Sequence, residues 1–120
     1  MVNNNLIKDK SADFALRIVN LYRFLYDSKN EKVLSKQILR SGTSIGANIA
    51  ESVYASSKAD FINKLQIAQK EAGETEFWLE LLSKADYIDK KQFDSMLLDC
   101  KELLKLLTAI LKKSKTTIDI

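Results

Sequence analysis

Residues 41–82 read SGTSIGANIAESVYASSKADFINKLQIAQKEAGETEFWLELL, and two helical patterns in them flank a short serine turn. Before the turn, Ile45, Ile49 and Val53 recur every four residues. After the turn, a second apolar face comprises Phe61, Leu65, Ala68, Ala72, Leu79 and Leu82. Apolar residues at steps of three and four line up on one side of a helix. The stretch therefore predicts two amphipathic helices with one core face each.

Two further stripes run beside the apolar face of the first of these helices. Small residues form one stripe, which a partner helix can approach closely: Gly42, Gly46 and Ala50. Polar residues form the other stripe: Ser41, Ser44, Asn48 and Glu51. On the second helix, a row beside the core face comprises Glu71, Thr75 and Trp78. This part of the chain thus combines a surface suited to close helix packing with polar groups next to the core.

Length and composition extend this pattern to a whole domain. A chain of 120 residues with 46% hydrophobic content suits one domain spanning residues 1–120, built around a single core. The chain has no proline and only three glycines, which favours long helices over sheets that need turn residues every few positions. We therefore predict an all-α, antiparallel up-down four-helix bundle.

The first two helices are bounded by serines that can act as caps. Ser11 is expected to cap the first helix, which ends near Ser28, so that residues 1–10 form a flexible polar end. The apolar face of this helix comprises Phe14, Ile18, Leu21, Tyr22 and Leu25. Ser35 is expected to cap the second helix, which continues through the opening stretch to about Ala55.

The last two helices follow the serine turn. Ser57 and Asp60 fit a capping box that starts the third helix, which is expected to run to about Lys84. Gly73 interrupts this helix, either as a break or as a site where another backbone packs closely. The fourth helix has a broad apolar band: Phe93, Met96, Leu97, Cys100, Leu103, Leu104, Leu107, Ile110 and Leu111. The pattern is lost from Lys112 onward, so residues 113–120 are expected to be flexible.

The residue inventory argues against an enzyme and against a cofactor. The chain has no histidine, and its single Cys100 lies on an apolar stripe. Dinuclear metal sites in bundles use Glu-x-x-His motifs, and serine or cysteine nucleophiles need a base. The SGTSIG segment lacks the Lys-Ser/Thr ending of a nucleotide-binding loop. We therefore expect no catalytic residues, no metal site and no cofactor.

The same inventory bears on the cellular compartment. One cysteine cannot form an internal disulfide, and no apolar run approaches the roughly 18 residues that a membrane span needs. The first residues also lack the apolar core of a signal peptide. A cytoplasmic protein without a membrane partner is expected.

Basic residues are distributed unevenly along the chain. The net charge is +4 over residues 1–58, −3 over residues 59–88 and +2 over residues 89–120. In a bundle, this segregation can gather basic side chains on one side and favour binding to phosphates without strong sequence preference. The candidate contacts to RNA or DNA are Arg17, Arg23, Lys36, Arg40, Lys101, Lys105, Lys112 and Lys113.

Three residues of the central stretch allow both a structural and a functional interpretation. Asn48 and Glu51 can form a polar network that sets helix register or subunit geometry, or they can contact a ligand. Trp78, which follows Phe77, can pack in the core or an interface, or stack on a nucleobase. The structural interpretation is the commoner one for each residue type in this setting.

The central stretch also resembles a known family. The segment SIGANIAE at residues 44–51, followed by the serine turn and DFINKLQIAQKEAGETEFWLELL, is similar to the 23S rRNA intervening-sequence protein family. The resemblance extends over roughly residues 14–112. Family members often have glycine after the glutamate, where this chain has Ser52.

The resemblance implies a four-helix bundle that assembles into a ring, typically a pentamer, without established catalytic activity. It also implies a structural importance for the motif residues Gly42, Ser44, Gly46, Asn48, Glu51, Glu71 and Trp78. A related bundle is the accessory protein of diversity-generating retroelements, which works with a reverse transcriptase and nucleic acid. Two functions therefore remain open: an oligomeric accessory protein that binds nucleic acid, and an oligomeric protein-interaction module that does not.

Overall fold

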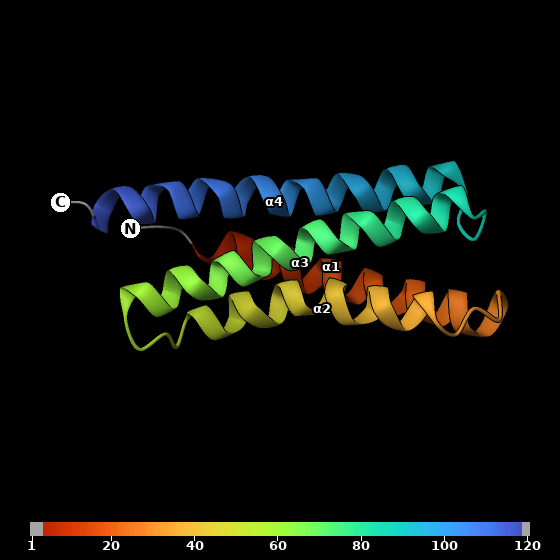
Figure 1. The fold of residues 1–120 in the computed structure, drawn as a ribbon, viewed down its shortest axis with the longest axis horizontal. Coiled ribbons are helices and arrows are strands. Elements are labelled where there is room, and N and C mark those ends of the chain that lie inside the picture. The colour runs from red at the N-terminus through yellow and green to blue at the C-terminus, as the bar shows by residue number, and fades with distance from the viewer. Residues whose placement is uncertain (1–3, 119–120) are drawn as a thin grey trace.

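Four long helices make up the protein in the computed structural model, which describes residues 4–118. They are α1 (Asn4–Arg23), α2 (Leu34–Ser52), α3 (Lys58–Lys84) and α4 (Lys90–Ile118), and a π-helical turn, η1 (Phe24–Ser28), extends α1. Successive helices run in opposite directions, and no strand occurs among the described residues (Figure 1). The predicted all-α, antiparallel up-down four-helix bundle is confirmed.

The helices do not contact one another equally. Packing is most extensive between α2 and α3, followed by the α1–α2 and α3–α4 pairs, and it is much weaker between α1 and α4. The beginning of α1 and the end of α4 lie at one end of the bundle, and the α1–α2 and α3–α4 turns lie at the other (Figure 1). The longest extent of the molecule is 51 Å.

One apolar core runs along the bundle axis. Its large, fully buried side chains come from all four helices: Ile7, Phe14, Ile18, Leu25, Ile38, Ile45, Ile49, Leu65, Leu79, Leu82, Leu103 and Leu107. These residues confirm the faces expected from periodicity, although some residues expected on those faces are only half-buried: Tyr22, Phe61, Phe93, Leu97 and Leu104. Val53 is an exception, because α2 ends at Ser52 and the Val53 side chain is 47% exposed.

The first helix begins seven residues before the expected start at Ser11. Ile7 lies seven residues before Phe14 on the same face and is only 2% exposed, so the helix is anchored in the core from its second turn. Ser11 is buried inside the helix, and its hydroxyl donates to the carbonyl of Lys8 at 3.0 Å. The predicted Ser11 cap is therefore wrong, and residues 4–10 of the expected flexible end are helical. Residues 1–3 lie outside the described part.

The last helix also continues beyond its expected end. It runs to Ile118, and both Leu111 and Ser114 are buried. Because Leu107, Leu111 and Ser114 follow one another at steps of four and three, the core face of α4 extends past Lys112. The expected flexible tail is thus helical through residue 118, and residues 119–120 lie outside the described part.

Carboxylates and one serine cap the later helices. Ser57 Oγ accepts from the Asp60 amide at 3.1 Å, which confirms the predicted cap of α3. Ser35, by contrast, lies inside α2 and does not cap it. Glu31 caps α2 instead, since its Oε1 accepts hydrogen bonds from the amides of Val33 at 3.1 Å and Ser35 at 2.8 Å.

A reciprocal pair starts α4. Asp89 Oδ1 accepts from the Gln92 amide at 2.7 Å, and Gln92 Oε1 accepts from the Asp89 amide at 3.0 Å. This arrangement is a capping box with Asp and Gln in place of Ser and Glu. The spacing of three residues between Asp89 and Gln92 in the sequence indicates it.

Two of the three glycines mark the place where α1 and α2 approach each other. A Cβ atom on Gly42 would lie 2.6 Å from Ile18 Cγ1, and one on Gly46 would lie 3.2 Å from the carbonyl oxygen of Ser11. Close packing at these two positions is confirmed. A Cβ atom on Gly73 would meet no described atom within 4 Å. The expected close backbone contact at Gly73 is therefore absent from the described residues, and α3 continues through it without a break.

Candidate nucleic-acid interface

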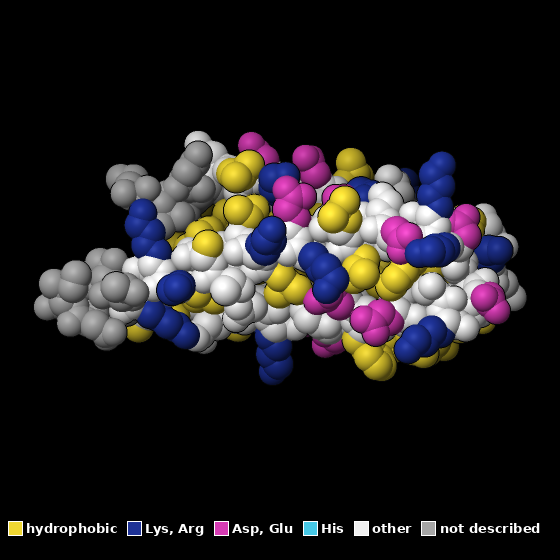
Figure 2. Space-filling model, turned by 90° about the horizontal axis from the view of Figure 1, so that it is seen from above, with side chains coloured by type: hydrophobic (Ala, Val, Ile, Leu, Met, Phe, Trp, Pro, Cys, Tyr) yellow, Lys and Arg dark blue, Asp and Glu magenta, His cyan; other side chains and the backbone are white. Residues whose placement is uncertain are grey.

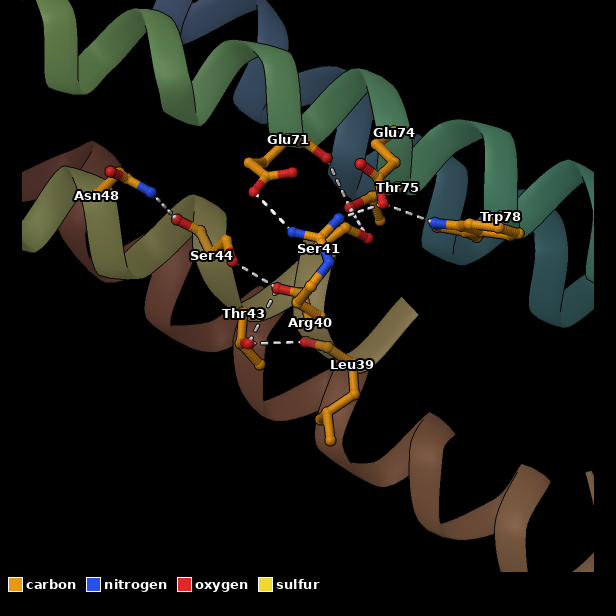
Figure 3. A network of polar contacts seen from close by, with 10 residues as sticks. All are labelled: Leu39, Arg40, Ser41, Thr43, Ser44, Asn48, Glu71, Glu74, Thr75 and Trp78. Atoms are coloured by element: carbon orange, nitrogen blue, oxygen red, sulfur yellow. Dashed lines mark hydrogen bonds and ion pairs between the residues drawn. The ribbon is translucent and has the colours of Figure 1, made fainter. Parts of the chain in front are cut away.

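A network of charged and polar side chains joins α2 to α3 (Figure 3). Arg40 Nη1 donates to Glu71 Oε2 at 2.9 Å, and Arg40 Nη2 donates to Glu74 Oε2. Trp78 Nε1 donates to the same Glu74 oxygen at 2.9 Å. The hydrogen bonds from Trp78 and Arg40 lower the pKa of Glu74, and those to Glu71 and Glu74 raise the pKa of Arg40.

A buried pair of hydroxyls lies below this network. Thr75 Oγ1 and Ser41 Oγ are 3.0 Å apart and hydrogen-bonded, and both side chains are fully buried. Thr75 Oγ1 also donates to the Glu71 carbonyl at 2.8 Å. Because both hydroxyls have partners, they link α2 and α3 without the cost of an unpaired buried polar group. The polar network across this interface is thus centred on Arg40, Ser41 and Thr75.

The polar stripe of α2 mostly bonds within its own helix. Asn48 Nδ2 donates to the Ser44 carbonyl at 2.8 Å, and Ser44 Oγ donates to the Arg40 carbonyl at 2.6 Å (Figure 3). Glu51 is exposed and pairs with Lys64 of α3 at 3.1 Å. The structure therefore places a half-buried Asn48 and an exposed Glu51 outside the buried hydroxyl pair.

Trp78 packs at the edge of the core. Its ring is partly buried against the apolar cluster and meets the Phe77 ring edge-on, with 5.0 Å between centroids. The indole N–H is bonded to Glu74, which fixes the ring on α3. The neighbouring Phe77 is 56% exposed. The exposed aromatic face on α3 is thus that of Phe77.

The basic candidates do not gather on one side. Arg17 pairs with Asp99 at 2.5 Å between α1 and α4, and Lys101 pairs with Glu76 at 3.2 Å between α3 and α4. Arg40 pairs with two glutamates between α2 and α3. These three side chains therefore neutralise acidic neighbours on different helix pairs.

One group of basic candidates shares a shallow groove on α4. Its lining comprises Lys101, Leu104, Lys105, Thr108, Ala109 and Lys112. The lining contains no acidic residue, and Leu104 and Ala109 supply an apolar floor. Seen from the side of α4, basic, acidic and hydrophobic side chains are interspersed along the bundle (Figure 2). Lys113 follows directly after the groove on the same helix.

A second group lies at the α1–α2 turn. Lys36 Nζ is 6.0 Å from the centre of the Tyr26 ring, and Lys32 Nζ is 5.1 Å from it. The rings of Tyr22 and Tyr26 lie 5.5 Å apart. Arg23 lies between the two tyrosines in the chain. Tyr22, expected on the core face of the first helix, is only half-buried. The tyrosine spacing of four residues in the sequence indicates that the two rings are neighbours.

Two kinds of site are not found among the described residues. No group of three or more histidine, cysteine or carboxylate side chains is placed to hold a metal ion in residues 4–118. In the same range, no helix is both long enough and apolar enough to span a bilayer.

The single cysteine is buried in the core. Burial raises the pKa of the Cys100 thiol to about 12, and its sulfur donates to the Ala72 carbonyl at 3.4 Å.

The fold and the surface define a helical bundle with charged and aromatic side chains on its outside. The family model described as 23S rRNA-intervening sequence protein matches residues 3–109, so the chain belongs to that family. This result confirms the family resemblance, and it extends the match to the start of α1.

A solved structure agrees with this assignment. The chain is similar to a protein of unknown function from the S23 ribosomal protein family of Bacteroides thetaiotaomicron VPI-5482, with 59% sequence identity and a TM-score of 0.91. The match covers 92% of this chain and 99% of that one. No curated protein matches the chain.

Proposed function

We propose that this protein is a non-catalytic accessory protein that binds RNA or DNA through the α4 groove. The observation that carries the proposal is the set of three lysines around an apolar floor with no carboxylate in the lining. Lysine ammonium groups bind phosphates as point charges, and binding of this kind depends little on base sequence. Leu104 and Ala109 leave room for sugar and base edges between the lysines.

The ion pairs decide which candidates contribute. Lys105 forms no ion pair among the described residues, so its charge is available to a phosphate. Arg17 and Arg40 hold carboxylates of their own bundle, and a phosphate would have to displace those carboxylates first. Lys101 likewise pairs with Glu76. We therefore assign the phosphate contact to Lys105 and a structural function to Arg17 and Arg40.

Assembly is part of the same proposal. Phe77 on α3 and Leu98 on α4 are 56% and 67% exposed, and large exposed apolar side chains favour contacts between protein surfaces. We propose a homo-oligomer, with the pentameric ring that the family resemblance implies. A ring repeats each groove, so one nucleic acid can contact several subunits. A reverse transcriptase is one protein partner that the resemblance implies.

The same apolar side chains support a second candidate function. If Phe77 and Leu98 bind a different protein, the molecule is an oligomeric interaction module, and its lysines only keep the surface soluble. The two functions differ in the response of nucleic-acid binding to salt and to charge reversal in the groove.

The test is a fluorescence anisotropy titration of the protein into labelled nucleic acids, from about 50 to 200 mM salt. The nucleic acids are several DNA duplexes of unrelated sequence and one structured RNA. We expect log affinity to fall linearly with log salt, with a slope of roughly −0.9 for each duplex phosphate neutralised. Lys105→Glu should weaken binding to all sequences alike.

Lys91→Glu is the matched control, since it makes the same charge change on an exposed position of α4 outside the groove. Binding that falls equally in both variants would show a response to net charge alone and contradict the assignment to the groove. Absence of binding at the lowest salt, in protein of known oligomeric state, would leave the protein-interaction module as the better account.

A further inference from the structure

The end of α1 departs from α-helical geometry at an aromatic segment. Residues Phe24–Ser28 form a π-helical turn, in which the Lys29 amide donates to the Phe24 carbonyl at 3.2 Å. Isolated π-helical turns are rare and frequently occur at functional sites. Leu25 remains buried in this turn, so the core is maintained while the neighbouring residues are presented at the surface.

Aromatic rings and lysine ammonium groups lie close together around this turn. Tyr22 and Tyr26 are partly buried, and their rings are tilted by 44° with 5.5 Å between centroids. Lys32 and Lys36 of the following segment lie within 5.1 and 6.0 Å of the Tyr26 ring centre. Lys29 lies 5.6 Å from the Phe24 ring centre. Ammonium groups are therefore held around ring faces that lie at the surface.

The segment around the turn, residues 23–36, has a positive net charge, and one of its two carboxylates is already hydrogen-bonded. Residues 23–36 contain four basic and two acidic side chains. Of the two acids, Glu31 is bonded to the amides at the start of α2. The remaining acid, Asp27, is exposed. Lysines thus outnumber the free carboxylate next to the rings.

We propose that Tyr22, Tyr26, Lys32 and Lys36 form a stacking site for unpaired bases of single-stranded nucleic acid. The inference rests on the proposed function and adds the kind of strand that is bound. Aromatic rings stack on any base, and nearby lysines pair with the phosphates on either side of it. In this arrangement the two lysines move from the Tyr26 ring to the phosphates when a base takes their place.

The position of the site complements the α4 groove. The α1–α2 turn lies at one end of the bundle, and the carboxyl half of α4, which carries the groove, runs toward the other end (Figure 1). A duplex contacts the groove lysines through its phosphates alone. A strand with unpaired bases can also engage the tyrosines, so the protein should bind single-stranded regions more tightly than duplex regions.

The test compares a single-stranded oligothymidine with a strand of the same length made of abasic sites, which keeps the phosphates and lacks the bases. Wild-type protein should bind the strand with bases more tightly. Tyr26→Leu should weaken that binding about fivefold to 150-fold, as expected for one stacked base. It should leave binding to the abasic strand unchanged. Tyr26→Phe keeps the ring and should retain wild-type affinity, and a single-stranded RNA probe distinguishes RNA from DNA preference.

The outcomes distinguish failure of the stacking site from failure of the proposed function. Equal wild-type affinity for the two strands overturns the stacking site, and a Lys105→Glu variant that weakens both strands then leaves the proposed function intact. No binding of any probe by wild-type protein overturns both. If Tyr26→Leu does not fold, as judged by its thermal melt, Tyr26→Phe and the comparison of the two strands with wild-type protein remain, and equal wild-type affinity for the two strands still overturns the site.

Discussion

At the level of single residues, the same residue type serves opposite purposes at different places. Gly42 faces the Ile18 side chain, and there is no room for even a methyl group between α1 and α2. Gly73 faces open space in the middle of α3 and supports no contact among the described residues. Helix propensity alone therefore determines the effect of a side chain on stability at Gly73, whereas packing against Ile18 determines it at Gly42.

Two single substitutions, Gly73→Ala and Gly42→Ala, should change the free energy of unfolding in opposite directions. Gly73→Ala should raise the free energy of unfolding by up to about 1 kcal/mol, because alanine is the better helix former. Gly42→Ala should lower it by about 1–3 kcal/mol, because the new Cβ atom clashes with Ile18. Urea denaturation of the two variants measures both effects. A destabilised Gly73→Ala variant would show that α3 is covered at this point, for example by another subunit.

The ion pairs of Glu74 make stability depend on pH. Hydrogen bonds from Trp78 and Arg40 lower the pKa of Glu74 from its ordinary value of 4.5. A carboxyl group with a lowered pKa stabilises the fold above the unfolded-state value, and the contribution is lost as pH falls through the folded-state value. The side chain of Glu74 is 36% exposed, so solvent screening limits the effect to under about 1 kcal/mol.

Replacement of Glu74 by glutamine removes this dependence. Glu74→Gln should be less stable than wild-type protein near neutral pH, and the difference should shrink as pH falls below about 4.5. Urea denaturation at several pH values measures the difference. Glu80→Gln is the control, because Glu80 is exposed on the same helix and forms no ion pair among the described residues. A constant difference across pH would contradict the proposed charge effect.

At the level of helices, the first turns of α1 are the least expected part of the structure. Periodicity from Phe14 to Leu25 is clear in the sequence, but a cap-like Ser11 and the polar residues before it suggested a late start. The helix begins earlier because Ile7 reaches the core and Ser11 bonds to the carbonyl of Lys8 within the helix. Tertiary burial here outweighs a local capping signal.

Two neighbouring residues test whether this early segment stabilises the fold. Ile7→Ala should lower the free energy of unfolding by about 2–5 kcal/mol, because it removes a buried side chain. Leu6→Ala, at a side chain that is 47% exposed, should cost far less. Thermal melts of both variants compare them directly. Equal midpoints would show that the first turns of α1 contribute nothing to the core.

At the level of the whole molecule, the surface combines the α4 groove with isolated apolar side chains. If Phe77 lies between subunits, Phe77→Ser should reduce the assembly to smaller species, because an interface aromatic buries a large apolar area. Sedimentation velocity measures the size of the assembly. Tyr54→Ser, at an exposed residue after the end of α2, is the matched control and should leave the size unchanged. An unchanged size for Phe77→Ser would place the interface elsewhere.

The sequence by itself determined the four helices, their core faces and the family. Steps of three and four residues are a local property of one helix, so the faces could be assigned without knowledge of any partner. The Ser57 cap of α3 is equally local, since Ser57 and Asp60 lie within one turn.

Only the tertiary structure decided which charges remain for a ligand. Arg40 pairs with Glu71 and Arg17 with Asp99, and these partners lie 31 and 82 residues apart in the chain. Helical periodicity carries no information on how one helix is shifted along another, so such pairs cannot be assigned from the spacing within either helix. The same limit applies to the Tyr26 site, because the lysines around its ring come from a segment that the α1–α2 turn folds back onto α1.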